Sequence, residues 1–269
     1  MSGFAADWLA LREPADRRAR DVGLMRRASD WLAAAGQGAT VVDLGCGTGS
    51  TLSAFEACRD EGTPQVRWRL VDNDPALLDA AAERARNLGV DAETRLVDLA
   101  VIDDIPLEGA RLVTASALFD LASRDFISGL AERIVASGAG LHAALSYDGS
   151  TSFRPDHPLD GIVVAGFNRH QLRPKGLGAG ASLGPGAARA LAGALQAQGY
   201  LVELADSPWR LGPQDAALSI AHVDGMATAV AELGVLDPAE LEAWRRMRVD
   251  SADRSETLVG HLDLLALPG

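Results

Sequence analysis

The pattern of hydrophobic and polar residues changes near Thr40. Before it, residues 4–35 are rich in Ala, Leu and Arg, and their larger apolar side chains are spaced as on amphipathic helices (Trp8, Leu11, Leu24, Trp31). Pro14 is expected to break this stretch, because a proline inside a helix removes a backbone hydrogen bond. The pattern therefore predicts two N-terminal helices, which form a helical cap over residues 1–37.

After Thr40, short apolar strands alternate with helical stretches. The predicted strands are VVDL, VRWRLVD, AETRLVD, ARLVTAS and GAGLHAALSY, with YLVELAD following Gly199. Asp74, Pro75 and Gly89 occupy the positions of an N-cap, a first helical residue and a helix end around residues 76–88. Such alternation favours βαβ units. The predicted fold class is α/β, a doubly wound, mostly parallel sheet with helices on both faces.

Two segments interrupt this alternation. Between Gly149 and Gly186 periodicity is lost and Gly, Pro and isolated polar residues accumulate, which predicts a lid-like insertion without regular structure or a partly disordered segment. Helical periodicity returns over 187–198. Two further helices, near 213–233 and 238–248, form a predicted helical insertion over 213–249, the second opened by a capping box that begins at Asp237. The apolar segment 257–267 predicts one last strand.

Composition narrows the class of protein. The chain has 269 residues, a net charge of -12 and 48% hydrophobic residues, which is typical of a globular protein with one large domain, here residues 38–269. The acidic excess argues against duplex nucleic acid or an anionic membrane as a partner. No basic leader or membrane-length apolar run occurs. Cys46 and Cys58 are expected to lie beyond disulfide reach, so a cytoplasmic protein with reduced thiols is expected. The oligomeric state is left open.

The stretch Asp43-Leu44-Gly45-Cys46-Gly47-Thr48-Gly49 joins a predicted strand to a helix. Three glycines at alternate positions let a ligand approach bare backbone amides at a helix N-terminus, although a structural turn is the simpler alternative. A dinucleotide site would read Gly-x-Gly-x-x-Gly, whereas here the third glycine comes one residue early. The carboxylate of Asp43 would repel a pyrophosphate but tolerate an ammonium or a sulfonium. We therefore expect a cofactor that is cationic at this end.

Two more acids end the next predicted strands. Asp72 follows Gly49 by 23 residues, where a carboxylate in a doubly wound fold accepts hydrogen bonds from ribose hydroxyls. Asp98 ends the third strand, where it could accept from the exocyclic amine of an adenine, with Leu99 covering the ring. Either acid could instead be a helix cap or a turn residue. Three predicted strands that each end in Asp place a row of three acids at the carboxyl edge of the sheet, where ligands bind in such folds.

These residues resemble the first motif of the class I, Rossmann-like S-adenosylmethionine-dependent methyltransferases, Asp-x-Gly-x-Gly-x-Gly, which is complete here. The resemblance implies a seven-stranded sheet whose last strand is antiparallel and lies between the fifth and the sixth. It implies S-adenosylmethionine as cofactor and S-adenosylhomocysteine as product. The implied cofactor-binding residues are Asp43, Gly45, Cys46, Gly47, Gly49, Asp72, Asn73, Asp98, Leu99 and Ser116.

The methyl acceptor is less defined. Amide and adenine-amino methyltransferases of this family carry Asn-Pro-Pro-Tyr after the fourth strand, but this chain has Ser116-Ala117-Leu118-Phe119-Asp120, and Ser116, Leu118 and Asp120 are expected to line the cleft. We therefore expect in-line transfer to an oxygen or nitrogen of a small molecule. Rival hypotheses are an NAD-dependent oxidoreductase and a non-catalytic S-adenosylmethionine-binding regulator or partner subunit.

Candidates for substrate contact or a general base come from the fifth strand and the insertion after it. They are Tyr147, Asp148, His157 and His170. With the N-terminal helices, the insertion is predicted to form a mobile cover that sets acceptor specificity. His142, His222 and His261 lie in apolar patterns and are predicted to be structural. No Cys or His cluster has zinc spacing, so no metal is expected.

Overall fold

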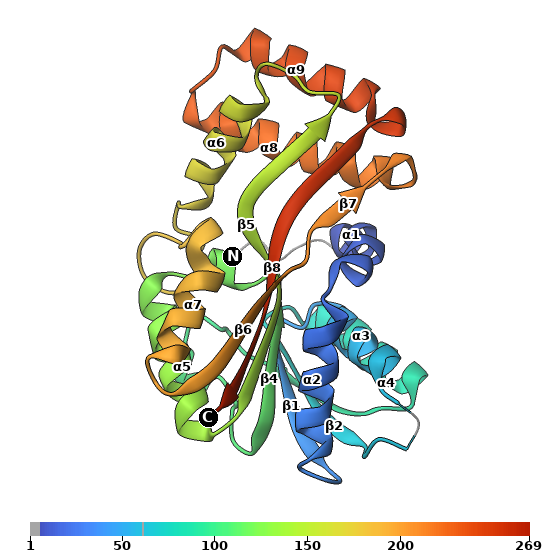
Figure 1. Cartoon of the computed structure of the whole chain (residues 1–269), viewed down its shortest axis with the longest axis vertical. Helices are drawn as coiled ribbons and strands as arrows, with labels where there is room; N and C mark the ends of the chain where they lie inside the picture. Colours follow the sequence, from blue (N-terminus) through green and yellow to red (C-terminus); the bar gives the residue numbers. More distant parts are fainter. Residues whose placement is uncertain (1–5, 61) are drawn as a thin grey trace.

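The computed structural model describes residues 6–60 and 62–269, which form a sheet flanked by helices and a helical lobe at one end of it (Figure 1). The strands are β1 (Ala39–Leu44), β2 (Val66–Asp72), β3 (Asp91–Leu96), β4 (Ala110–Ser116), β5 (Gly140–Arg154), β6 (Tyr200–Asp206), β7 (Trp209–Leu211) and β8 (Glu256–Pro268). The helices are α1 (Ala6–Ala19), α2 (Val22–Ala33), α3 (Ser50–Cys58), α4 (Pro75–Leu88), α5 (Arg124–Ser137), α6 (Asp160–Gln171), α7 (Ala187–Gln196), α8 (Ala216–Leu233) and α9 (Pro238–Asp250). The first five residues of the predicted cap lie outside the described residues.

The strand order is β3-β2-β1-β4-β5-β8-β6. Strands β1 to β5 pair in parallel, and β8 is antiparallel to both β5 and β6. This confirms the doubly wound sheet with its antiparallel last strand between the fifth and the sixth. The expected total of seven strands is wrong, because the short strand β7 pairs with the outer half of β8. Three residues are too few to give a readable alternation of polarity.

Successive side chains of each central strand point to opposite faces of the sheet, because the side-chain pattern of a strand repeats every two residues. Val41 joins the apolar cluster under α2, α3 and α4, whereas Val42 joins the cluster under α5 and α7. The predicted helix at 76–88 is confirmed as α4, with the Asp74 side chain capping its start and Gly89 at φ +68° ending it. These two layers fix the carboxyl ends of β1, β2 and β4 at one edge.

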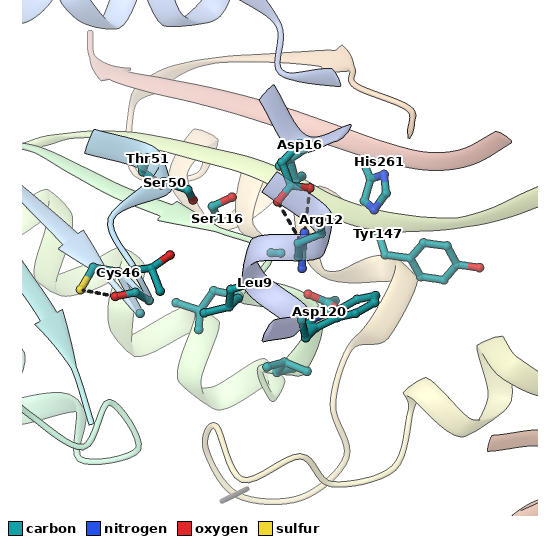
Figure 2. A pocket seen from close by; sticks show the side chains of 18 of the residues that line it. Leu9, Arg12, Asp16, Cys46, Ser50, Thr51, Ser116, Asp120, Tyr147 and His261 are labelled. Atoms are coloured by element: carbon teal, nitrogen blue, oxygen red, sulfur yellow. Dashed lines mark hydrogen bonds and ion pairs between the residues drawn. The ribbon is translucent and has the colours of Figure 1, made fainter. Parts of the chain in front are cut away.

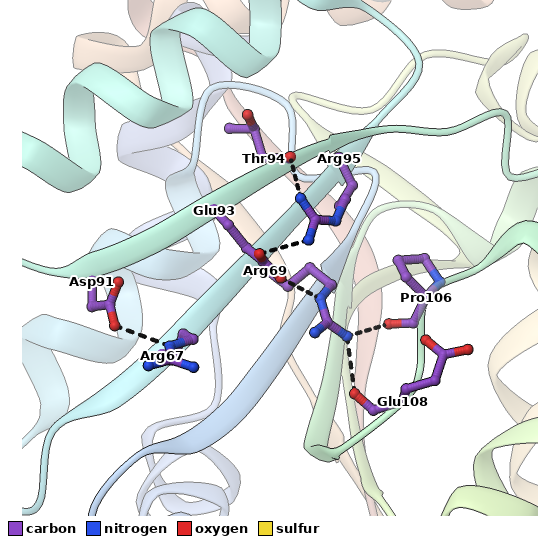
Figure 3. Close-up of polar contacts among 8 residues, drawn as sticks. All are labelled: Arg67, Arg69, Asp91, Glu93, Thr94, Arg95, Pro106 and Glu108. Carbon is purple, nitrogen blue, oxygen red and sulfur yellow. Dashed lines mark hydrogen bonds and ion pairs between the residues drawn. The ribbon is translucent and has the colours of Figure 1, made fainter.

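The edge strand β3 departs from the predicted apolar strand. It ends at Leu96, two residues before Asp98, and most of its residues are exposed. Register places Arg67 beside Asp91 and Arg69 beside Glu93, and both pairs form ion pairs, at 3.0 and 2.6 Å (Figure 3). Charged side chains on an edge strand oppose its pairing with another chain, so the polar character of β3 follows from its position.

The prediction of an unstructured segment from Gly149 to Gly186 is wrong for most of its length. Strand β5 continues to Arg154 and α6 spans Asp160–Gln171, so regular structure is absent mainly over residues 172–183. Strand β5 is held by its pairing with β8, which matches Arg154 with Glu256. That partner lies about a hundred residues away, so local periodicity carries no sign of the pairing.

The long arms of β5 and β8 carry the second lobe, where α6, α8 and α9 pack together (Figure 1). Its core contains Phe153, Met226 and Trp244. The side chain of Asp160 ties the lobe together, because its Oδ1 accepts from Trp244 Nε1 at 2.8 Å and its Oδ2 accepts from Arg248. The predicted helical insertion over 213–249 is therefore one part of a lobe that also includes α6.

Helix α1 runs through Pro14, so the predicted break there is wrong. The chain turns instead at Arg20 and Asp21, and the Asp21 side chain accepts from Leu24 N at 2.7 Å to cap α2. One pair within the helix and one tertiary bond hold the turn that contains Pro14: Asp16 pairs with Arg12 of α1 at 2.8 Å and accepts from Trp209 Nε1 of β7 at 2.8 Å. These bonds offset the amide hydrogen that proline lacks.

Asp263 joins three parts of the chain at the centre of the molecule. This fully buried carboxylate on β8 accepts from Leu145 N and from Asp21 N, each at 2.8 Å. Leu145 lies in a bulge of β5 and has φ +57°, a left-handed conformation that non-glycine residues seldom adopt. The bond to Asp263 therefore stabilises a costly backbone turn and anchors the start of α2.

Replacing Asp263 with Ala should destabilise the fold by roughly 2 to 5 kcal/mol, because two buried backbone amides lose their acceptor. The free energy of unfolding in urea measures this, with Asp253→Ala as control, since Asp253 is exposed and pairs only with its neighbour Arg254. Equal stability of the two variants would show that the bulge holds itself without Asp263.

Candidate functional site

The loop between β1 and α3 presents backbone amides. Gly45, Gly47 and Gly49 have φ values of +62°, +53° and +82°, so all three are left-handed, the conformation that favours glycine. Two bonds hold the loop against β2: Cys46 N donates to Val71 O at 3.0 Å, and Gly47 N donates to an Asp72 carboxylate oxygen at 2.9 Å. No side chain caps α3 at Gly49, so its first amides are left for another partner.

Asp72 is buried at the end of β2 and faces this loop. Its Oδ2 accepts from Gly47 N, and its Oδ1 accepts from Asn73 N at 2.8 Å and Asp74 N at 3.1 Å. A carboxylate has about four acceptor positions, so one remains for a ligand hydroxyl. Asp72 therefore shapes the glycine loop as well as lining the space beside it.

Asp43 and Arg20 lie under the floor of the site. Asp43 Oδ1 accepts from Thr114 Oγ1 at 2.8 Å, whereas its Oδ2 has no hydrogen-bond partner. Burial raises the pKa of Asp43 to about 7, although Thr114 and the charge of Arg20 act in the opposite direction. The Arg20 guanidinium donates to Ser116 Oγ at 3.0 Å and lies 3.4 Å from Thr51 Oγ1. Both hydroxyls belong to residues of the floor, so Arg20 places a positive charge directly beneath it.

A cavity of about 650 Å³ extends from the glycine loop into the second lobe. Figure 2 shows Cys46 at one end of the view, His261 and Tyr147 at the other, and Leu9, Arg12 and Asp120 between them. At the loop end the lining residues include Gly45, Cys46, Gly47, Thr48, Ser50, Thr51, Asp72, Asn73, Leu77, Leu99 and Ser116. Volumes of 300 to 1,000 Å³ are usual for small-molecule sites, and this one has two chemically different ends.

Most of the expected cofactor residues meet at the loop end of this cavity. Gly45, Cys46, Gly47, Asp72, Asn73, Leu99 and Ser116 line it. Three do not: Asp43 lies beneath the floor, Gly49 caps α3, and Asp98 is exposed, with its Oδ1 accepting from Ala100 N at 3.0 Å. Asp98 therefore has the geometry of a turn residue. Cys46 and Cys58 are free thiols, as expected, and burial raises the pKa of Cys46 well above its usual value.

The expected acid–base candidates are scattered. Tyr147 lines the cavity, but its hydroxyl donates to Asn168 Oδ1 at 2.9 Å, so it presents its ring. Asp148 accepts from Ser150, and His157 accepts from Leu159 N near the start of α6. His170 bonds Glu232 at 3.0 Å on the outside of the lobe. Asp148, His157 and His170 do not line the cavity. Asp148 lies in the extended part of β5, His157 lies just before α6, and His170 lies on α6.

Five aromatic side chains close the far end of the cavity and are here called the aromatic chamber. They are Tyr147, Phe167, Trp209, His222 and His261. Their rings contact one another in a closed circuit, with centroid separations of 5.6 Å, 6.1 Å, 6.4 Å, 5.0 Å and 6.2 Å in the order Tyr147, Phe167, His222, Trp209, His261 and back to Tyr147. Each comes from a different element: β5, α6, β7, α8 and β8. Trp8 and Arg12 of α1 complete the wall.

The two histidines of the chamber are neutral at physiological pH. Burial lowers the pKa of His222 to about 4 and, with the nearby charge of Arg12, that of His261 to about 3. His261 Nδ1 lies 3.1 Å from Val259 O, which can only accept, so Nδ1 carries the hydrogen and Nε2 keeps its lone pair. The prediction that both histidines are purely structural is therefore incomplete, since both line the cavity.

Three charged lining residues have no ion-pair partner among the residues that the structure describes: Asp72 at the loop end, Asp120 and Lys175. Asp120 follows β4, and its buried Oδ1 accepts no hydrogen bond. Lys175 lies in the irregular stretch after α6 and is the one lysine of the sequence, which otherwise uses arginine. The sequence predicts that Asp120 lines the cleft. The sequence pattern around Lys175 gives no indication that this residue lies at a site.

Solved structures with a similar fold include several methyltransferases. A structure described as a putative type II methyltransferase from Anaeromyxobacter dehalogenans aligns with 94% of this chain and 99% of its own, at 16% identity and a TM-score of 0.51. The fold is that of a Rossmann-like methyltransferase. A methyltransferase fold with 14% identity (TM-score 0.46) occurs in geranyl diphosphate methyltransferase in complex with S-adenosylmethionine, covering 91% of this chain and 84% of that one. An S-adenosylmethionine-dependent methyltransferase from Aquifex aeolicus matches 74% of this chain and 90% of its own at 16% identity (TM-score 0.45).

Sequence comparisons add no closer relative to this methyltransferase fold. No family model matches the chain, and no curated protein matches it. None of the described helices combines the length and apolar character that crossing a bilayer demands. Within residues 6–60 and 62–269, no three His, Cys, Asp or Glu side chains come together in a way that could hold a metal ion.

Asp43 should make the stability of the fold depend on pH. Its pKa is about 7 in the folded protein and 3.8 at its ordinary value, so the folded state holds a proton that the unfolded state has lost between these limits. The contribution of Asp43 to the free energy of unfolding is fully present below about pH 4 and is lost as the pH rises through about 7. Between these limits the free energy of unfolding should fall by at most about 1.4 kcal/mol per pH unit.

Asp43→Asn should remove this slope. Urea unfolding of the Asp43→Asn variant and of the unaltered protein at several pH values from 4 to 7.5 measures the slope. Subtracting one free energy of unfolding from the other cancels the contribution of the buried histidines, which both proteins share. Asp79→Asn, an exposed position on α4, is the matched control and should behave as the unaltered protein does. Parallel curves for Asp43→Asn and the unaltered protein would contradict the raised pKa.

Proposed function

We propose that this chain is an S-adenosylmethionine-dependent methyltransferase that acts on an oxygen or nitrogen of a small molecule by in-line displacement. The observation that carries the proposal is the two-ended cavity. Its loop end offers free backbone amides, a buried carboxylate and the charge of Arg20, whereas its chamber end is aromatic. A site with two such ends suits two different ligands that meet between Leu9, Arg12 and Asp120.

The residues at the loop end fit the proposed cofactor. The uncapped amides of the first turn of α3, with Arg20 behind Ser116, suit a carboxylate. The remaining acceptor position of Asp72 suits a ribose hydroxyl, and Leu99 offers an apolar cover for an adenine. When bound, S-adenosylmethionine supplies a methyl group that is already activated on a sulfonium. The protein then has to position the acceptor and exclude water.

The chemistry of the neighbours named above agrees with this proposal, because geranyl diphosphate methyltransferase was solved with S-adenosylmethionine. The rival dinucleotide function is disfavoured by the glycine spacing, because the third glycine comes one residue earlier than in Gly-x-Gly-x-x-Gly. Calorimetric titration with S-adenosylmethionine, S-adenosylhomocysteine and NAD separates these two. Turnover of an acceptor separates an enzyme from a non-catalytic S-adenosylmethionine-binding protein.

Gly47→Val should abolish S-adenosylhomocysteine binding in that titration. The new side chain would start from a left-handed backbone and lie 3.1 Å from Leu9 in the narrow part of the cavity. Gly89→Val is the matched control, because Gly89 is also left-handed but has open space around its Cβ position. Both variants bear backbone strain, and only Gly47→Val obstructs the site. Normal affinity in a folded Gly47→Val protein would remove this loop from the cofactor site.

Asp72→Asn should weaken S-adenosylhomocysteine binding roughly 10- to 150-fold, equivalent to about 1.5 to 3 kcal/mol, because a charge-assisted hydrogen bond to the ribose is lost. Its melting temperature must be measured too, since Asp72 also holds Gly47 N. Asp98→Asn, which changes an exposed carboxylate away from the cavity, should bind as the unaltered protein does. An unchanged dissociation constant for Asp72→Asn would place ribose recognition elsewhere.

A further inference from the structure

Apart from Asp72 at the loop end, the charges of the residues that line the cavity add to zero. Arg12 is paired with Asp16 at 2.8 Å, and its guanidinium already lies 5.1 Å from the ring centroid of Trp209. The remaining pair of opposite charges is Asp120 and Lys175, each without a salt bridge in the described part of the chain. A molecule with a net charge would leave an unbalanced charge in a poorly hydrated space. The cavity therefore suits a neutral acceptor.

The aromatic chamber adds two further requirements. Its five rings offer flat apolar contacts at spacings that suit stacking or edge-to-face packing. A cation is disfavoured, because Arg12 already occupies a face of Trp209. The free lone pair of His261 Nε2 can accept a hydrogen bond from a donor on the ligand. A planar aromatic molecule that carries hydroxyl groups meets all of these conditions.

Asp120 is placed where the two ends of the cavity meet. It lies four residues after Ser116, which lines the loop end, and in Figure 2 it lies between Cys46 and His261. Its Oδ1 is buried and has no protein partner. The charged groups that face it are Arg12 from α1 and Lys175 from the stretch after α6. Asp16 and Asp72, by contrast, each accept protein hydrogen bonds on both carboxylate oxygens.

We propose that the acceptor is an uncharged phenol held in the aromatic chamber, and that Asp120 is the catalytic residue that takes its hydroxyl proton. This inference rests on the proposed function. The phenol oxygen forms a bond to the methyl carbon while the carbon–sulfur bond breaks and leaves its electron pair on sulfur. The phenol proton passes to Asp120 and then to water, so S-adenosylmethionine and phenol give S-adenosylhomocysteine, methyl ether and one proton. Burial raises the pKa of Asp120, which brings this carboxylate closer to the basicity that proton abstraction needs.

Four phenols with the same scaffold test the chamber. Calorimetry in the presence of saturating S-adenosylhomocysteine should show binding of 4-cresol, with tyramine and 4-hydroxybenzoate at least tenfold weaker because each carries a charge. Phe167→Ala should weaken 4-cresol binding at least fivefold and leave S-adenosylhomocysteine affinity within twofold. Phe153→Ala is the matched control, since it removes an aromatic side chain from the core of the same lobe but away from the cavity.

The fourth phenol, 4-nitrophenol, tests Asp120 through kcat alone, because it ionises near neutral pH and needs no base above pH 8. As an anion it should bind more weakly than 4-cresol. Asp120→Asn should lower the turnover of 4-cresol at least 100-fold, in line with the usual contribution of a general base, but that of 4-nitrophenol less than tenfold at pH 8.5. Asp120→Glu should recover part of the 4-cresol rate. Asp79→Asn should have no effect on either substrate.

The possible negative results distinguish failure of the proposed function, of the phenol assignment and of the role of Asp120. Absence of S-adenosylhomocysteine binding would overturn the proposed function itself. Binding of S-adenosylhomocysteine without any binding of 4-cresol, or tighter binding of tyramine or 4-hydroxybenzoate, would overturn the phenol assignment and leave the methyltransferase proposal standing. Equal loss of 4-cresol and 4-nitrophenol turnover in Asp120→Asn would show that Asp120 positions the acceptor and takes no proton.

Discussion

The buried carboxylate of Asp263 sets the geometry on which both ends of the cavity depend. By accepting from Leu145 N and Asp21 N, it fixes a left-handed residue in β5 and the junction between α1 and α2. The bulge at Leu145 marks the place where β5 leaves the central sheet for the second lobe, and the junction directs α1 across the cavity. The carboxylate of Asp263 thus links the bulge of β5 to the start of α2, two parts of the chain that lie far apart in the sequence.

The position of the second lobe explains how a common fold acquires a cavity with a second, aromatic end. Strands β5 and β8 extend beyond the sheet and, with β7, carry Tyr147, His261 and Trp209, while α6 and α8 add Phe167 and His222. The cofactor end is built from short loops at the carboxyl edge of the sheet, where ligands of doubly wound folds bind. The lobe can therefore vary in sequence while the glycine loop and Asp72 keep their geometry.

Sequence reasoning succeeded where the signal is local and failed where it is not. The loop from Asp43 to Gly49 and the position of Asp72 at the end of β2 could be predicted, because a strand end, a turn and a helix start fall within a few residues of one another. The length of β5 depends on pairing with β8 about a hundred residues later, and polar residues such as Ser150 gave that extension the pattern of a loop. His222 and His261 sit in apolar patterns, so only their meeting with Trp209 in space reveals that they face a cavity. Asp98 met the expected spacing, yet the edge strand ends before it.

The bias of the sequence toward arginine has a practical consequence at the cavity wall. Because Lys175 is the one lysine, reagents that acylate side-chain amines have a single target in this chain, and that target faces the presumed meeting point of two ligands. A small environment-sensitive dye attached there would report occupancy of the cavity by its emission colour, with no need for a known substrate. The protein thus carries a built-in attachment point for screening collections of candidate acceptors.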